Sequence, residues 1–260
     1  MKFTAKRVIG PGAFLLAFCL FFPGFGSQQA VMRPTRPTIG KAFTYIRSSA
    51  KGERLDSYVE HIEELAEGSV PAFQRIQEYK NRVVRATVRQ SDLAPLFTEH
   101  LWKDGTQRLL IKYEPGQARV TLTEKGAQAF DKTLKLPAGT LDNDAYLLNF
   151  FGYPFAEGGE VPMDVVVYYD KRVKLVTLEV EGKGRKAVKT PAGTFDCNVL
   201  ELSLSGFWGG LAPSSDFLLA TDNPPYLVKV EWGSGEVTEL IKRPEPCSET
   251  VCKEKAALPR

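Results

Sequence analysis

Short runs rich in β-branched and aromatic residues alternate with glycine-containing turns from Phe43 onward. The turn signals recur at residues 51–53, 66–69, 103–106, 114–117, 181–184 and 233–236. Runs and turns at this spacing are typical of an antiparallel β protein. We therefore predict a mainly β fold, which is an antiparallel, strongly curved sheet or a partly open barrel with one or two short helices.

Apolar and polar positions alternate most clearly in two stretches, residues 172–182 and 195–207. The apolar side chains that share a face are Val176, Leu178 and Val180 in the first stretch, and Leu200, Leu202 and Leu204 in the second, opposite Phe195, Cys197 and Val199. Each stretch is predicted to be a strand with a clearly apolar face. Residues 165–170 are apolar on both faces, which indicates a central strand covered on both sides.

Two segments carry a helical signal. Residues 56–67 fit either an amphipathic helix with Val59, Ile62 and Leu65 on one side or a strand that pairs with residues 43–49, and periodicity leaves the two open. Residues 142–152 predict a helix that Asp142 caps, that carries an apolar stripe, and that Gly152 ends.

One octet pattern occurs twice, as KLPAGTLDN from Lys135 and as KTPAGTFDC from Lys189, with six of eight positions identical. In the second copy Pro191 fixes its own φ and Gly193 accepts a positive φ, so the pattern predicts a compact chain reversal between two strands. The flanking sequences do not repeat, which favours convergent turn chemistry over an internal duplication.

The N-terminus has the pattern of a secretory signal peptide, because three positive charges precede an apolar run. We expect cleavage after Gly26, export to the periplasm or secretion, and no transmembrane helix in the mature chain. The predicted organisation is a signal peptide (1–26), an extended linker (27–41), an antiparallel β domain (42–243) and a C-terminal tail (244–260).

Charge and cysteine content narrow the classes further. The chain has 34 Lys and Arg against 31 Asp and Glu, and loss of Lys2, Lys6 and Arg7 with the signal leaves 31 of each sign. A neutral protein without a basic block lacks the footprint of a nucleic-acid binder. In an oxidising compartment Cys247 and Cys252 are predicted to form a disulfide, while Cys197 is interpreted as a buried thiol.

The stretch around the second octet, EVEGKGRKAVKTPAGTFDCNVLEL, followed by DNPPYLVKVEW and GEVTELI, resembles the bacterial exported proteins of the domain-of-unknown-function family DUF3108. The resemblance is strongest over residues 160–241. It implies an antiparallel β sheet with no established activity and no catalytic residues to carry over. It also favours the strand alternative for residues 56–67, because such proteins tend to open with a long hairpin.

The sequence offers little for catalysis, since no metalloprotease, nucleophile-elbow, dinucleotide or phosphate-loop pattern occurs. We expect a non-enzymatic protein without a cofactor or metal. Apolar side chains in Gly- and Pro-rich segments are the candidate ligand site, unless they only plug the open end of the sheet. These are Phe150, Phe151, Tyr153, Phe155, Phe207, Trp208 and Leu211. The expected partner is a lipid or other apolar ligand, or an envelope protein; the alternatives are an envelope scaffold and a hydrolase using Asp164, Asp170 or Asp216.

Overall fold

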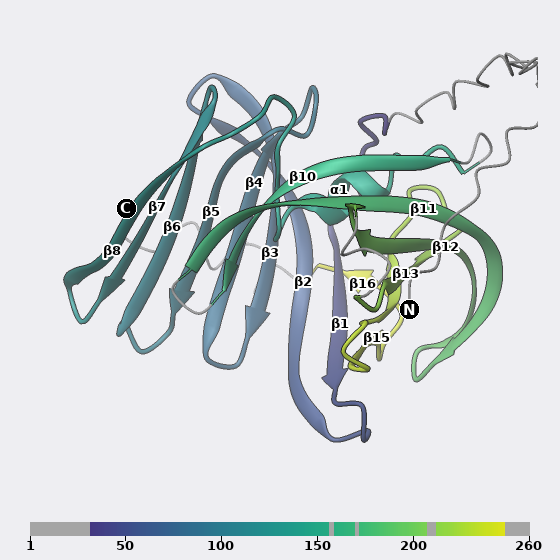
Figure 1. Ribbon diagram of the computed structural model, residues 1–260. Coiled ribbons are helices and arrows are strands. Elements are labelled where there is room, and N and C mark those ends of the chain that lie inside the picture. Colours follow the sequence, from purple (N-terminus) through teal and green to yellow (C-terminus); the bar gives the residue numbers. More distant parts are fainter. Residues whose placement is uncertain (1–31, 156–158, 170–171, 207–211, 248–260) are drawn as a thin grey trace, which may run out of the picture.

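The computed structural model describes residues 32–155, 159–169, 172–206 and 212–247, and their strands form one large, mainly antiparallel sheet that curls without closing (Figure 1). The first half of the sheet is a meander of eight strands: β1 (Lys41–Ser48), β2 (Arg54–Glu67), β3 (Val70–Tyr79), β4 (Arg82–Arg89), β5 (Pro95–Trp102), β6 (Gln107–Glu114), β7 (Gln117–Glu124) and β8 (Ala127–Lys135). The second half contains β9 (Leu141–Asp142), β10 (Glu160–Tyr169), β11 (Arg172–Thr190), β12 (Gly193–Leu204), β13 (Ser215–Ala220), β14 (Leu227–Glu231) and β15 (Val237–Leu240). The prediction of a mainly β, curved and incompletely closed fold is confirmed.

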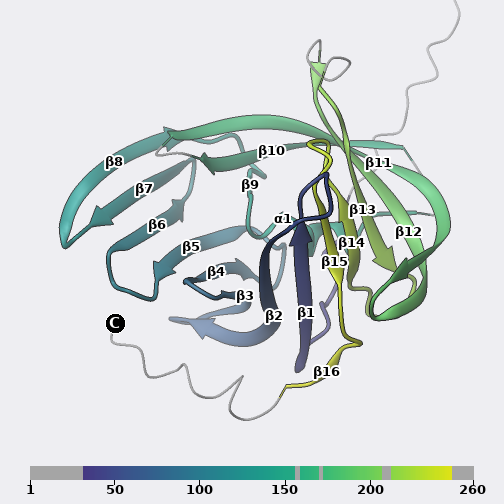
Figure 2. The same ribbon diagram turned by 90° about the horizontal axis from the view of Figure 1, so that it is seen from below.

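The two halves meet where β1 pairs antiparallel with β15, for example Tyr45 opposite Leu240. Strand order therefore runs from β8 through β1 and β15 to β10 and β9, so β8 and β9 are the two ends of the sheet. A short strand β16 (Glu245–Pro246) also pairs with β1. Seen from below, the sheet rolls so that β10 and β11 sweep back towards β8 (Figure 2).

Residues 56–67 lie in strand β2, which pairs with β1 on one side and with β3 on the other. Along β2 the side chains of Tyr58, Glu60 and Ile62 point to the inner face and are buried. Val59 and Leu65, which a helix would bury together with Ile62, are only half-buried. Pairing on both edges thus decides the state that periodicity left open.

The predicted helix is shorter than expected, since α1 covers only Tyr146–Phe150. Asp142 does not cap it: Ala145 occupies the N-cap position without a side-chain hydrogen bond, and Asp142 belongs to β9. Instead, Asp142 Oδ1 accepts a hydrogen bond from the backbone N–H of Asp144 at 2.7 Å, a local turn that competes with capping. Residue 152, after the helix, has no room for a side chain, because a Cβ there would lie 1.6 Å from the carbonyl oxygen of Arg33. Glycine is therefore required at this position.

The described residues form two separate apolar cores. The larger one fills the space between β1–β4, α1 and β10–β15, and the smaller one packs β6 and β7 against β10 and β11. Strand β10 joins them, because Val165 belongs to the larger core and Val166, on the opposite face, to the smaller. The predicted double coverage of residues 165–170 thus holds for Val165 and Val166, although β10 is next to the end strand β9 rather than central.

Both octet copies form turns, but of different geometry. In the β11–β12 hairpin Thr190 pairs with Gly193, so Pro191 and Ala192 form a two-residue loop, and Gly193 has φ 131°. In the first copy Gly139 has φ 78° and the segment joins β8 to β9. The repeated letters therefore serve two connections, a hairpin and a loop at the rim of the sheet.

Candidate functional site

The predicted apolar ligand residues that the structure describes lie in the larger core. Phe150, Phe151 and Tyr153 are buried, and the half-buried Phe155 packs against that core. Phe150 contacts the Phe217 ring at a centroid distance of 5.1 Å. As packed, these rings join the two halves of the sheet, and none of them lines the pockets described below.

Tyr153 also has a polar structural role. Its hydroxyl donates to the carbonyl oxygen of Gly159 and accepts from the backbone N–H of Gly182 at 2.8 Å. A Cβ on Gly182 would lie 2.9 Å from the Tyr153 ring, so glycine permits this approach. The β10–β11 pair is thereby tied to the segment after α1.

Several predicted residues lie outside the described part of the chain: Phe207, Trp208, Leu211, Asp170 and Cys252. The pairing of Cys247 with Cys252 stays a prediction for this reason. Cys197 is a buried free thiol whose pKa is raised to about 11 by burial and by the nearby Asp196 and Asp222 carboxylates. A thiol of this kind is unreactive at neutral pH, in line with its interpretation as a packing residue.

The side chains that sequence reasoning missed form a buried polar cluster on the inner face, between the two cores. Arg75 Nη2 donates to Glu60 Oε2 at 2.7 Å, and Gln77 Nε2 donates to the same oxygen at 3.1 Å. The second Arg75 nitrogen, Nη1, donates to the carbonyl oxygen of Asp144 at 2.6 Å. Arg75 therefore joins β2 and β3 to the turn that leads into α1.

A second part of the cluster pairs His100 on β5 with Asp144 across 2.7 Å. Burial disfavours the imidazolium, but the Asp144 carboxylate outweighs burial, so the pKa of His100 is raised. Burial likewise opposes ionisation of Asp144, yet His100, Arg75 and Arg82 together lower its pKa. The pair is thus an ion pair in mildly acidic solution.

Asp142 is the acid of this cluster that resists ionisation. It is 1 % exposed, and its Oδ2 accepts a hydrogen bond from the Tyr113 hydroxyl at 2.5 Å. Burial and the neighbouring Asp144 charge raise the pKa of Asp142 to about 6. The cluster contains proton-exchanging groups near neutral pH, but among the described residues no group of three His, Cys, Asp or Glu side chains is arranged to hold a metal ion.

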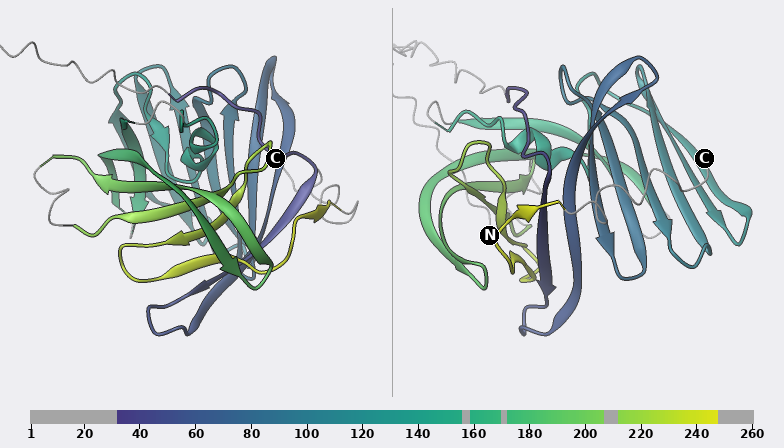
Figure 3. Two further views of the ribbon diagram at one scale, coloured as in Figure 1. Left: turned by 90° about the vertical axis from the view of Figure 1, so that its right-hand side faces the viewer. Right: turned by 180° about the vertical axis from the view of Figure 1, so that it is seen from behind.

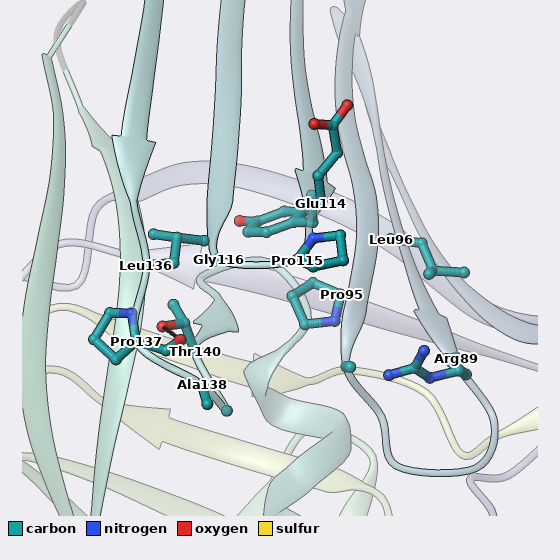
Figure 4. Close-up of a pocket in the computed structure, with 13 residues that line it drawn as sticks. Arg89, Pro95, Leu96, Glu114, Pro115, Gly116, Leu136, Pro137, Ala138 and Thr140 are labelled. Carbon is teal, nitrogen blue, oxygen red and sulfur yellow. Dashed lines mark hydrogen bonds between the residues drawn. The ribbon is translucent and has the colours of Figure 1, made fainter.

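Tyr113 connects this buried cluster to a pocket at the rim of the sheet, with a volume of about 410 Å³ (Figure 4). Three connections build its walls: β4–β5, β6–β7 and the first octet copy between β8 and β9. Pro95 and Pro115 lie on one side of it, and Pro137 and Ala138 lie on the other. The remaining lining residues are Arg89, Ala94, Leu96, Tyr113, Glu114, Gly116, Leu136, Gly139 and Thr140.

The carboxylates that a hydrolase hypothesis named do not gather in this pocket. Asp164 Oδ1 accepts a hydrogen bond from the Thr177 hydroxyl at 2.6 Å, on β10 and β11. Asp216 lies on β13, 4.0 Å from the Lys186 ammonium group. Each carboxylate therefore belongs to a surface strand pair, and the described geometry does not bring the two together.

Comparison with known proteins places the chain in a family. The model of DUF3108, a protein family of unknown function, matches residues 53–240. The chain belongs to the DUF3108 family. No curated protein sequence is significantly similar to it. The match of the family model confirms the resemblance seen in the sequence, and it supplies no activity.

Three solved structures to which the chain is similar share 13% sequence identity with it. A β-barrel-like protein of the DUF1849 family from Brucella abortus has a TM-score of 0.46, covering 80% of this chain and 98% of that one. A protein from Bacteroides fragilis described as exported, with a YmcC-like fold, has a TM-score of 0.35 over 83% and 99% of the two chains. A protein from Parabacteroides distasonis described as a lipoprotein has a TM-score of 0.33 over 84% and 100%.

No helix in the described ranges combines the length and the apolar character that a membrane span requires.

Proposed function

We propose that this DUF3108 protein is a non-enzymatic binding protein of the bacterial envelope, which holds an apolar ligand group in the pocket at the rim of the sheet. The pattern of the first 26 residues supports export to the periplasm or secretion. The observation that carries the binding role is the pocket between the three connections, lined mainly by proline, leucine and alanine side chains.

The size and construction of the pocket suit such a role. About 410 Å³ lies within the range of roughly 300–1,000 Å³ that small-molecule sites occupy. Pro95, Pro115 and Pro137 restrict the backbone of the three walls, so little conformational entropy is lost when a ligand orders them. At the inner end Tyr113 presents its ring to the pocket while its hydroxyl is held by Asp142.

A titration with N-phenyl-1-naphthylamine, a neutral apolar dye, tests this proposal. Ala138 is exposed on the pocket wall, so Ala138→Trp is expected to fill the pocket without disturbing the core. Ala129→Trp is the matched control, since Ala129 is an exposed alanine of β8 that lines no pocket described here. The dye should bind the unmodified protein and the control alike and bind Ala138→Trp at least tenfold more weakly; equal binding by all three would refute the pocket.

The alternative is a scaffold that docks an envelope partner. The observation that favours it is the exposure of large apolar side chains at strand ends, above all Tyr169, which is 79% exposed at the end of β10. Under this alternative the dye would not bind, and replacement of Tyr169 by serine would weaken capture of a partner from envelope extracts.

A further inference from the structure

The outer face of the first half of the sheet is turned towards the viewer in the right-hand view of Figure 3. The residues on this face line a groove that shares no residue with the rim pocket. One cavity of about 700 Å³ lies between the tip of the β2–β3 hairpin and strands β4–β6. A second, of about 330 Å³, continues over β6–β8. Both are bounded by Arg108, Leu110 and Lys112 of β6, so the two cavities form one groove.

The strand register places the lining side chains on the outer face. Arg85 pairs with Glu99, Glu99 with Leu110, and Leu110 with Thr121, and residues directly opposite in an antiparallel sheet share a face. Their neighbours along the same strands, such as Val84 and His100, point to the inner face instead. The groove is therefore separated from the buried polar cluster by the thickness of the sheet.

The centre of the groove holds two guanidinium groups on one carboxylate. Glu99 Oε1 accepts from Arg108 Nε at 2.7 Å, and Glu99 Oε2 accepts from Arg85 Nη1 at 3.1 Å. The three side chains together keep one net positive charge. Within the described residues the buried Nη2 atom of Arg85 has no hydrogen-bond partner, so the donors of this trio exceed the acceptors supplied to it.

Two further cations lie directly opposite each other, Lys112 on β6 and Arg119 on β7. Like charges at such positions repel each other. Arg119 is held by Asp131 through two hydrogen bonds, whereas Lys112 makes no ion pair within the described part of the chain. Glu67, at the tip of the β2–β3 hairpin, is an exposed acid at the edge of the groove. Because Asp131 already neutralises Arg119, Lys112 is the cation that an anionic group in the groove would pair with.

An apolar strip lies beside these charges. Phe97 and Leu101 of β5 and Leu110 of β6 are half-buried on the outer face, where a solvated sheet usually carries polar residues. Phe97 is directly opposite Lys112, and Leu101 is directly opposite Arg108. Each end of the strip therefore has a cation next to it.

We infer that this groove binds an anionic amphiphile, with its phosphate or carboxylate group at Lys112 and a single alkyl chain that runs from there along Phe97, Leu110 and Leu101. Charge complementarity selects the anionic head, and the strip between the cations selects the chain. The site is additional to the rim pocket, because no side chain is common to both.

Calorimetric titration of the mature protein with dodecyl phosphate, below its micelle concentration, tests the inference. Lys112→Ala should weaken binding about tenfold, the size expected for one charge-assisted contact, and Leu110→Ser should weaken it as well. Lys174→Ala, which changes an exposed lysine of β11 outside the groove, should have no effect. Inorganic phosphate and the uncharged dodecyl maltoside should each bind much more weakly than dodecyl phosphate.

Three outcomes would overturn the site. Equal affinity of Lys112→Ala and the unmodified protein would exclude the cationic head position, and equal affinity for inorganic phosphate and dodecyl phosphate would exclude the alkyl strip. Loss of dodecyl phosphate binding in Ala138→Trp would move the ligand to the rim pocket. Thermal midpoints equal to that of the unmodified protein establish that each variant is folded, and the dye titration reports the rim pocket separately.

Discussion

Replacement of Arg75 by methionine is expected to be among the most destabilising single changes in this protein. The Arg75 and Glu60 side chains are only 8% and 4% exposed, and they are joined across 2.7 Å. Methionine approximates the apolar length of the arginine side chain but cannot donate. The Glu60 carboxylate then keeps one side-chain donor, the amide of Gln77 at 3.1 Å, and the Asp144 carbonyl oxygen loses its contact with the guanidinium.

The magnitude follows from these contacts. Removal of one partner of a buried ion pair costs about 3–5 kcal/mol, because an uncompensated charge is left in a medium of low polarity. The orphaned Asp144 carbonyl oxygen contributes within that range, since effects in one network are not additive. We expect Arg75→Met to lower the free energy of unfolding by about 3–5 kcal/mol at pH 8.

The loss should depend on pH in a defined direction. A buried carboxylate without its cation costs the folded state less once acid has neutralised it, whereas the ion pair of the unmodified protein needs no such proton. The deficit relative to the unmodified protein should therefore be smaller at pH 5 than at pH 8. Urea denaturation followed by tryptophan fluorescence at both pH values measures it.

Two controls make the experiment decisive. Arg36→Met removes an Arg–Glu contact of similar length, 2.8 Å to Glu64, but Arg36 is 71% exposed, so its denaturation midpoint should hardly change. The double variant Glu60→Met, Arg75→Met should recover much of the lost stability, because no unpaired charge remains. A loss of unfolding free energy below about 1 kcal/mol for Arg75→Met would refute the reasoning, because a broken buried ion pair costs about 3–5 kcal/mol. An equal loss at both pH values would refute it as well.

Three further changes test other parts of the structure. Gly193→Val should lower stability by about 1–3 kcal/mol, because valine strains the positive φ of 131° at the β11–β12 turn; an unchanged thermal midpoint would contradict this. Asp142→Asn should reduce the loss of stability as pH rises from 4 to 7: the folded-state pKa of about 6 lies above the unfolded value of about 4, so the stability lost between these two values amounts to about 3 kcal/mol in all. The variant should still lose some stability as pH rises, because the raised pKa of His100 also contributes stability that is lost at higher pH. A pH profile of stability identical to that of the unmodified protein would show that Asp142 is not the titrating group. Alkylation of the denatured, unreduced mature protein should modify Cys197 alone, whereas modification of Cys247 as well would refute the predicted disulfide.

The strands that the sequence predicts best are those with one buried face. In β12 the buried Phe195, Cys197 and Val199 alternate with the more exposed Thr194, Asp196 and Asn198, and this pattern is sufficient to place the strand, although Leu200 on the other face is buried as well. Strand β2 carries glutamates on both faces, including the buried Glu60, so its pattern is blurred. The strand conformation of β2 is set by its pairing with β1 and β3, in which residues such as Phe43 and Glu60, or Tyr58 and Tyr79, lie opposite each other although they are well separated along the chain.

The buried polar cluster could not be predicted because its partners are far apart along the chain. His100 and Asp144 are separated by 44 residues, and Tyr113 and Asp142 by 29. The acids at positions 142 and 144 are visible in the sequence, but their appearance before an apolar run predicts a helix cap. Only the curl of the sheet brings β5 and β6 to these acids.

The apolar segment at residues 147–155 shows the opposite problem. Its composition fits a ligand surface and a core equally well, since both bury aromatic rings. In the structure Phe150 is fully buried against Phe217, a residue of β13. The pocket is instead built from the first octet copy and two other connections, whose meeting at one rim depends on sheet topology.

Native mass spectrometry of the mature protein, purified without detergent from a bacterial envelope, tests the proposed binding role most directly. The unmodified protein and Ala129→Trp should carry a stoichiometric apolar adduct that organic solvent extracts. Ala138→Trp, with a filled pocket and an unchanged thermal midpoint, should appear as the bare polypeptide. A bare polypeptide mass for all three proteins, or an adduct that persists in Ala138→Trp, would contradict binding in the rim pocket.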